Sequence, residues 1–503
     1  MAPVQLESQI NYSAVALAAG HVLAAILLTA GVGRSLYRSY RALGPAQETR
    51  ERRAQRSHHV PVFASLALIS LCTAVYASAQ HAILSYKRWA NAHAVQLPAR
   101  LYGDNGILPL GENSIDVFPG LWLSDTPFHL DTVEILAERA RRLWWGQQIE
   151  LSLIPWNLFL AIEGRRRNMP LLWCYPLLGQ LVSLSYAQNL FFLALLLTPS
   201  PLPSTDAGGL PMSRYIRIRD AIFRPKPSTW TPHTSLYLLT LALAYVPHWA
   251  TTRVVNTPHL KAVVLASRGL AMAPLLLHYV IPASWGSTHT KPHETYRVYT
   301  RLFKMISLAS FVLHGKATLE GLAHSAPDAY YHRHSQYLPF DMESRSAWER
   351  TTSGFGRILA ATADHPVVSG AGCDVLLSAL SLGLWAAVRA TDFQDFLACT
   401  VPGQVRSHAD GSEAEQDGHK STPTVARRRD GLRSGGKYKI DRDSSEEAYE
   451  PTPAVAASVT EGDVLPEAGD YDWESTALVW GMTILGGLGT GSAGVLGGEC
   501  IAR

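Results

Sequence analysis

Glu150 is the first residue for which chemistry can be argued, because it is an acid within an otherwise apolar stretch, WWGQQIELSLIPWN. Leu153 and Asn157 fall on the same side of the helix that this pattern predicts. An ionised carboxylate is costly inside a membrane span, so burial should keep Glu150 protonated, as a general acid must be. Trp145 and Trp156 flank it and could stabilise a cation with their ring faces. The alternative is that Glu150 pairs with an arginine and that the tryptophans form an interfacial belt.

A second group of proton-transfer residues lies in the stretch APDAYYHRHSQYLPFD. His332 and His334 alternate in sequence, with Asp328 before them and Asp341 after them. An aspartate–histidine pair can hold or relay a proton near neutral pH. The apolar segment Val367–Val388 follows, so we expect this group to close one end of a chamber that the other apolar segments build. Surface salt bridges and a metal site are the alternatives.

Two further sets of side chains could contact a substrate. Ser185 and Asn189 share one face of a predicted helix and Tyr186 flanks them. Phe311 and His314 lie on a stripe of another predicted helix. Interhelical hydrogen bonds and packing are the alternative roles for both sets.

The composition places these residues in a membrane protein. Of 503 residues, 47% are hydrophobic and 17% are charged, whereas soluble domains carry roughly 25% charged residues. The apolar residues gather in runs separated by polar loops, and this pattern predicts an all-α, polytopic transmembrane helical bundle of eight or nine spans within residues 1–400. A net charge of +3 gives no argument for a nucleic-acid partner, so the lipid bilayer is the expected surrounding.

The C-terminal fifth of the chain differs from the rest. Residues 401–470 are rich in Ser, Gly, Glu, Asp and Arg, and we expect this low-complexity loop to be disordered. Residues 471–503 hold a last apolar, glycine-rich segment that predicts a further transmembrane helix. Gly486, Thr490, Gly494 and Gly498 recur every four residues, so another helix should approach closely there.

Several enzyme signatures are absent from the sequence. We find no Walker loop, GxGxxG, GxSxG or HExxH motif. The Asp-rich patterns DDxxD and DxDD are also missing, which disfavours a reaction that starts from a diphosphate leaving group. His289 and His293 match the HxxxH spacing of membrane di-iron oxygenases, but Pro292 would interrupt the helix that sets the spacing of such ligands. We therefore predict neither a metal site nor a cofactor.

Blocks of sequence between about Trp144 and Asp392 resemble a known family. The blocks are WWGQQIELSLIPWN, LSYAQNLFFLALLLTP, RPKPSTWTPH, SWGSTHTKPH, APDAYYHRHSQYLPFD and DHPVVSGAGCDVLLSALSLGLWAAVRATD. They look like the fungal integral-membrane terpene cyclases of meroterpenoid pathways, of the ascochlorin, ascofuranone and macrophorin type. The resemblance implies that a farnesyl-type chain on an aromatic or cyclohexenone head is protonated at a terminal alkene or epoxide and then cyclised. It also implies a protein of the endoplasmic reticulum that needs no metal or redox cofactor.

We therefore predict a membrane terpene cyclase in which Glu150 is the proton donor, assisted or replaced by Asp328 and His334. Asn157, Ser185 and Asn189 are the predicted head-group contacts, and the aromatic side chains are the predicted cation stabilisers. The alternatives are a transporter of small solutes, with Glu150, Lys304 and Arg268 along its path, and a membrane di-iron oxygenase. In all three cases, Arg268 could neutralise the charge of Glu150 or Asp374.

Overall fold

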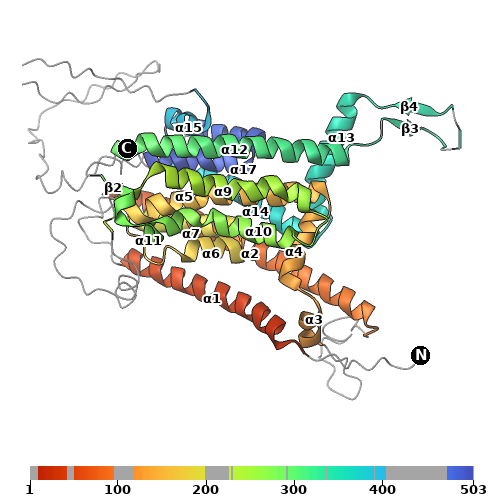
Figure 1. Ribbon diagram of the computed structural model, residues 1–503, viewed down its shortest axis with the longest axis horizontal. Helices are drawn as coiled ribbons and strands as arrows, with labels where there is room; N and C mark the ends of the chain where they lie inside the picture. Colours follow the sequence, from red (N-terminus) through yellow and green to blue (C-terminus); the bar gives the residue numbers. More distant parts are fainter. Residues whose placement is uncertain are drawn as a thin grey trace, which may run out of the picture.

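The computed structural model describes residues 10–41, 50–95, 118–198, 226–227, 230–289, 293–335, 337–338, 340–389, 391–403 and 473–501. These residues are mostly helical, and the long helices run roughly along one direction in a bundle (Figure 1). The predicted all-α fold is confirmed in this coarse sense. The predicted disordered loop lies outside the described residues, apart from its first three positions.

The long helices are, in chain order, α1 (Tyr12–Arg41), α2 (Arg50–Ala92), α5 (Ala140–Phe159), α7 (Leu184–Leu197), α9 (Thr234–Val254), α10 (Leu260–Ala271), α12 (His293–Ser325), α13 (Ala347–Ala360), α14 (Pro366–Arg389) and α17 (Trp473–Ile501). The shorter helical segments are α3 (Pro119–Asp125), α4 (Phe128–Ala137), α6 (Cys174–Leu181), α11 (Ala273–Val280), α15 (Phe393–Thr400), the π-helical turn η2 (Leu160–Gly164) and the 3-10 turns η3 (Ala283–Trp285) and η4 (Ala361–Ala363).

Four described helices are long and apolar enough to cross a membrane: α1, residues 58–92 of α2, α14 and α17. The pair α10 and α11 could form a fifth span, bent by 55° at the break between them. Our expectation of eight or nine spans is therefore not confirmed. The helices α5, α9 and α12 fall outside this set because polar side chains interrupt their apolar runs.

Helix α5 lies at the centre of the bundle and is where the candidate residues have to be placed. It packs against α9 and α10 on one side and against α12, α14 and α17 on others. Every residue from Leu151 to Gly164 is buried, across the end of α5 and through η2. Because α5 is surrounded, its successive side chains point into different parts of the interior.

The glycines of α17 allow the close approach that their spacing predicted. A Cβ atom at Gly498 would lie 2.8 Å from Thr391 Cγ2, and one at Gly497 would lie 2.8 Å from Phe303 Cβ. Side chains there would have to displace α12 or the residues before α15, so this small-residue face sets the packing distance.

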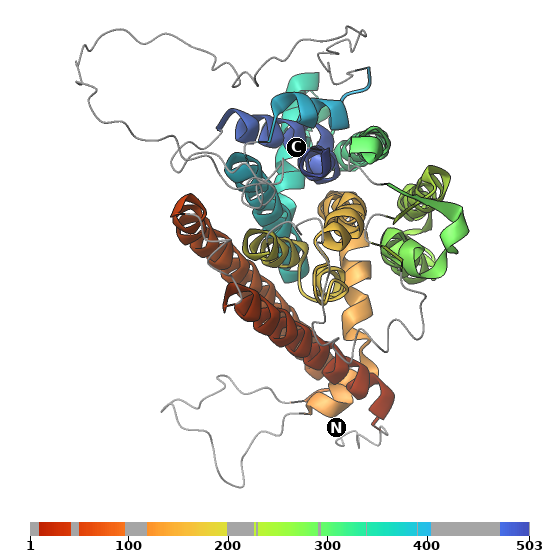
Figure 2. The same cartoon turned by 90° about the vertical axis from the view of Figure 1, so that its left-hand side faces the viewer.

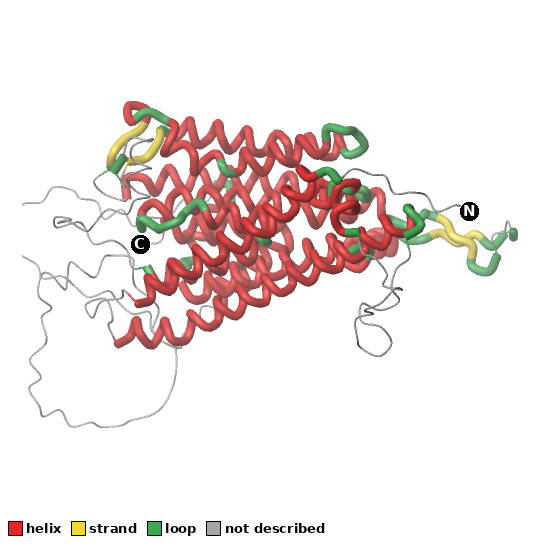
Figure 3. Tube along the Cα trace, turned by 90° about the horizontal axis from the view of Figure 1, so that it is seen from below, coloured by secondary structure: helices red, strands yellow, loops and turns green. Residues whose placement is uncertain are grey.

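Two antiparallel pairs of three-residue strands lie at opposite ends of the bundle (Figure 3). The strands β1 (Trp230–Pro232) and β2 (Gly286–Thr288) form one, and β3 (Tyr330–His332) and β4 (Met342–Ser344) form the other. No strand was predicted from the sequence, since strands this short lack a measurable alternation.

Candidate functional site

Glu150 of α5 is paired with Arg268 of α10, whose side chain is 35% exposed, so the pair lies at the edge of the interior. The Arg268 Nε atom donates to Glu150 Oε1 at 2.7 Å, and the Glu150 side chain is 13% exposed. This is the alternative that the sequence left open for Glu150. The guanidinium of Arg268 thus occupies the carboxyl group from which a proton would have to be given. The donor role thus requires the two side chains to separate.

His248 is a neighbour of this ion pair that sequence reasoning missed. It lies on α9, is buried, and its Nε2 atom is 3.0 Å from the hydroxyl of Ser267 on α10. Ser267 directly precedes Arg268 in the chain, so this contact places the His248 ring next to the turn of α10 that carries the ion pair. Tyr237, Leu241, Ala244, His248 and Thr251 form the buried face of α9 with helical spacing. That spacing was present in the sequence and could have placed His248 on the inner face.

Asn157 lies two helical turns beyond Glu150 and on the same side of α5, as its spacing predicted. Its side chain is fully buried, and neither its Oδ1 nor its Nδ2 atom has a hydrogen-bond partner among the described residues. A buried amide without partners costs about 1–3 kcal/mol. A polar group of a ligand or a water molecule would remove this cost.

The predicted aromatic contacts lie on other sides of α5. Trp156 packs edge-on against Phe191 of α7, with ring centroids 5.5 Å apart. Trp145 donates from Nε1 to the carbonyl of Ile358 in α13 at 2.9 Å. Seen along the bundle, α7 and α9 are on opposite sides of α5 (Figure 2). We had expected the two tryptophans to flank Glu150. They do not surround its carboxyl group.

Ser185, Tyr186 and Asn189 lie on α7, away from Glu150. The backbone N–H of Ser185 donates to Asp374 Oδ1 at 2.7 Å, so Asp374 of α14 caps the first turn of α7. The Tyr186 hydroxyl donates to Thr29 Oγ1 at 3.4 Å, and Asn189 Nδ2 donates to the Ser185 carbonyl at 2.8 Å. These contacts correspond to the packing alternative, although Asn189 Oδ1 has no partner among the described residues.

The Asp–His group of residues 328–341 lies in the hairpin of β3 and β4, which projects beyond the bundle (Figure 1). The expectation that it closes a chamber is therefore wrong. His334 Nδ1 is 2.8 Å from Asp341 Oδ1, and this hydrogen bond, with the backbone N–H groups of Ser335 and His334, lowers the pKa of Asp341 to about 2. Asp328 uses its carbonyl to accept from Arg345, and His332 is exposed on β3. The group holds the loop of the hairpin together.

The remaining candidates lie on α12 and around β2. Phe311 is 50% exposed, so it does not line the interior, whereas His314 is buried and lies 3.2 Å from Gln148 Oε1 of α5. His289 Nε2 is 2.7 Å from the Ser287 hydroxyl, and His293 is described by its backbone only. Within the described ranges, no three His, Cys, Asp or Glu side chains gather as metal ligands would.

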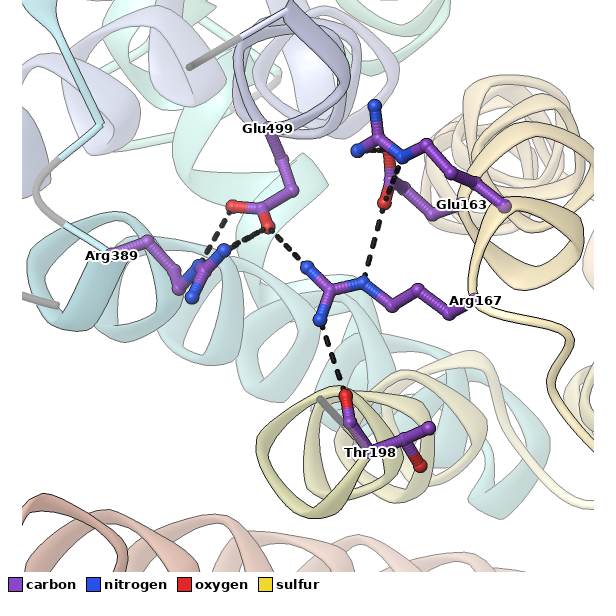
Figure 4. A network of polar contacts seen from close by, with 6 residues as sticks. Glu163, Arg167, Thr198, Arg389 and Glu499 are labelled. Carbon is purple, nitrogen blue, oxygen red and sulfur yellow. Dashed lines mark hydrogen bonds and ion pairs between the residues drawn. The ribbon is translucent and has the colours of Figure 1, made fainter. Parts of the chain in front are cut away.

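A buried network of charges joins four helix ends at one end of the bundle (Figure 4). Arg167 donates to Glu163 at 3.4 Å and to the carbonyl of Thr198 at 3.3 Å, and it lies 3.8 Å from Glu499. Arg389 of α14 donates to both Glu499 oxygens. The sequence showed Arg167 only as part of a basic run after an apolar segment, a pattern that usually marks a cytoplasmic helix end.

Comparison of this chain with protein-family models, with curated proteins and with solved structures finds no match.

Proposed function

We propose that this chain is a multi-pass membrane terpene cyclase of the endoplasmic reticulum. Its substrate would be a farnesyl-type chain on a prenylated aromatic or cyclohexenone precursor of fungal secondary metabolism. The sequence blocks quoted above support the substrate class. The observation that carries the proposal is the carboxyl group of Glu150 between α5 and α10, which is paired with Arg268, with His248 of the neighbouring helix α9 beside Ser267.

The reaction would start at Glu150 after Arg268 has moved off its carboxyl group and the carboxylate has taken up a proton from water. The proton adds to the terminal alkene, or to the epoxide oxygen as its C–O bond breaks, and leaves a carbocation. Ring closure moves the positive charge along the chain, and loss of a C–H proton ends the sequence with an alkene. Asn157 would hold a polar group of the substrate through its unpartnered amide. The surrounding apolar helices would keep water from the cation.

The test is an assay in microsomes of yeast that expresses the full chain. A farnesylated phenol is supplied with and without its terminal epoxide, in the presence of a chelator. We expect an isomer of unchanged mass by chromatography and mass spectrometry, and the substrate that reacts identifies the initiation step. A well-folded protein that converts neither substrate, or a product heavier by one oxygen, would overturn the proposal.

One observation favours transport as a second candidate. Transporters place binding sites where transmembrane helices are interrupted, and here α17 is interrupted at Gly487 and the pair α10 and α11 is bent by 55°. A transporter would carry the farnesylated phenol across the membrane of proteoliposomes and leave it chemically unchanged.

A further inference from the structure

The interruption of α17 brings its backbone against two polar side chains of neighbouring helices. Gly487 has φ +81°, a left-handed value that side chains rarely adopt. A Cβ atom there would lie 2.6 Å from His314 Nδ1 and 2.7 Å from Gln148 Oε1. The break therefore requires glycine both for its backbone conformation and for the space around it.

The orientation of the Gln148 amide follows from the break. The backbone N–H of Leu488, the first residue after Gly487, donates to the Gln148 side-chain oxygen at 3.2 Å. A backbone N–H can only donate, so the atom that faces it must be the oxygen. The Gln148 nitrogen in turn donates to the carbonyl of Trp144 at 3.4 Å.

The tautomer of His314 follows from the orientation of Gln148. The same Gln148 oxygen lies 3.2 Å from His314 Nδ1, so Nδ1 must carry the hydrogen and Nε2 of the neutral ring holds the lone pair. Nε2 has no hydrogen-bond partner among the described residues. The ring lies beside Trp144, with centroids 5.8 Å apart, and beside Gly487, and neither of these residues titrates.

We propose that His314 is the base that ends the cyclisation, with Gln148 and the break at Gly487 as its positioning groups. This inference rests on the proposed function. The C–H bond next to the final cation breaks, its electron pair becomes the alkene, and the proton binds His314 Nε2. The imidazolium then gives the proton to water when the product leaves.

An acid and a base at separate places suit such a reaction. Gln148 points towards α12 and α17, whereas Glu150, two residues along α5, points towards α10. Initiation and termination occur at different carbons of a prenyl chain, so the two groups need not be neighbours.

The tautomer can be tested without a substrate. Solid-state NMR of the ¹⁵N-histidine-labelled full chain in lipid should show a neutral His314 ring protonated at Nδ1, with the signal assigned from its absence in His314→Gln. Gln148→Leu should change the tautomer or the shift of that ring. A neutral ring protonated at Nε2 in the wild type would overturn the inference, whether or not the chain is a cyclase.

The base role is tested by products. In the microsomal assay, His314→Gln and Gln148→Leu should still consume substrate but give water-trapped alcohols or other alkene isomers. Val312→Ala, at a 59% exposed position of α12, is the matched control and should give the wild-type product. Wild-type product at the wild-type rate from both His314→Gln and Gln148→Leu would refute the role. No conversion by the wild type would instead remove the proposed function and leave the NMR result standing.

Discussion

Arg389 and Glu499 form a two-pronged ion pair that joins the end of α14 to the end of α17. The Arg389 Nη2 atom donates to Oε1 at 2.7 Å, its Nε atom donates to Oε2 at 3.0 Å, and the Glu499 side chain is 3% exposed. Arg167 approaches the same carboxylate at 3.8 Å. The Glu499 carboxylate thus contacts two guanidinium groups, of which that of Arg167 also pairs with Glu163.

Glu499→Gln should therefore destabilise the protein strongly. Removing one partner of a buried ion pair leaves uncompensated charge and costs about 3–5 kcal/mol. Thermal unfolding in detergent measures the effect as a lowered midpoint. Glu343→Gln is the matched control, because Glu343 pairs with Arg333 at 3.6 Å in the exposed hairpin, where ion pairs contribute about 0–1 kcal/mol. Equal midpoints for the two variants would contradict the role of the network.

Variants of Glu150 and Arg268 separate the effect of their ion pair on stability from the proposed role of Glu150 in turnover. Glu150→Gln and Arg268→Met should each lower the unfolding midpoint, because each leaves one charge without its partner, and the double variant should recover most of the loss. Turnover should disappear in both variants that carry Glu150→Gln and persist in Arg268→Met, whose Glu150 carboxyl is free of the guanidinium. Turnover by the folded double variant would reject Glu150 as the proton donor.

Because α17 is interrupted at Gly487, we expect an alanine there to lower the stability of the protein and an alanine at another glycine of the same helix to raise it. Gly487→Ala should lower the unfolding midpoint, because alanine is strained at φ +81° and its Cβ would collide with His314 and Gln148. Gly481→Ala, in the same helix with nothing within 4 Å of its Cβ, should raise stability by up to about 1 kcal/mol. Two variants of the same sign would show that α17 does not break where the structure places it.

Asp341 makes the hairpin sensitive to acid. Its pKa is lowered from 3.8 to about 2 by the hydrogen bonds from His334 and from backbone N–H groups, so its stabilising effect is complete above pH 3.8 and is lost as the pH falls through about 2. Cleavage of residues 333–341 by pepsin should accelerate over that range in the wild type, whereas Asp341→Asn should be cleaved quickly throughout. Because the hairpin lies outside the bundle, this variant should keep normal turnover. Loss of turnover without loss of fold would restore Asp341 to the site.

The helices and the faces of α5 could be predicted because they depend on local spacing. Glu150 and Asn157 are seven residues apart, which is two turns of any α-helix, so one face follows without knowledge of the fold. The close packing of α17 followed similarly from its small residues. The pairing of Glu150 with Arg268 was foreseen only as an alternative, because it depends on how α10 docks.

Other features depend on contacts that spacing does not encode. Many glycines lie in α17. Gly487 differs from the others by its positive φ and by its contacts with Gln148 and His314, which the spacing of the sequence does not show. The sequence did not show that the hairpin of β3 and β4 lies outside the bundle, since its Asp and His residues have the composition of a proton-transfer site. Eight or nine spans were expected because α5, α9 and α12 carry apolar runs. Polar side chains interrupt these runs, and the described residues hold four helices, or five spans with the bent pair, that are long and apolar enough to cross a membrane.

The position of α17 has a consequence for synthesis in the cell. This helix packs against α5, α12, α14 and α15, yet residues 401–472 separate it from α15 in the chain. The ribosome therefore synthesises α5 and α12 before α17. The hydroxyl of Ser152 in α5 can bond to that of Ser492, at 2.6 Å, only after α17 has been made. Until α17 arrives, the surfaces of α5, α12, α14 and α15 that contact it in the folded protein stay uncovered, with the Ser152 hydroxyl among them.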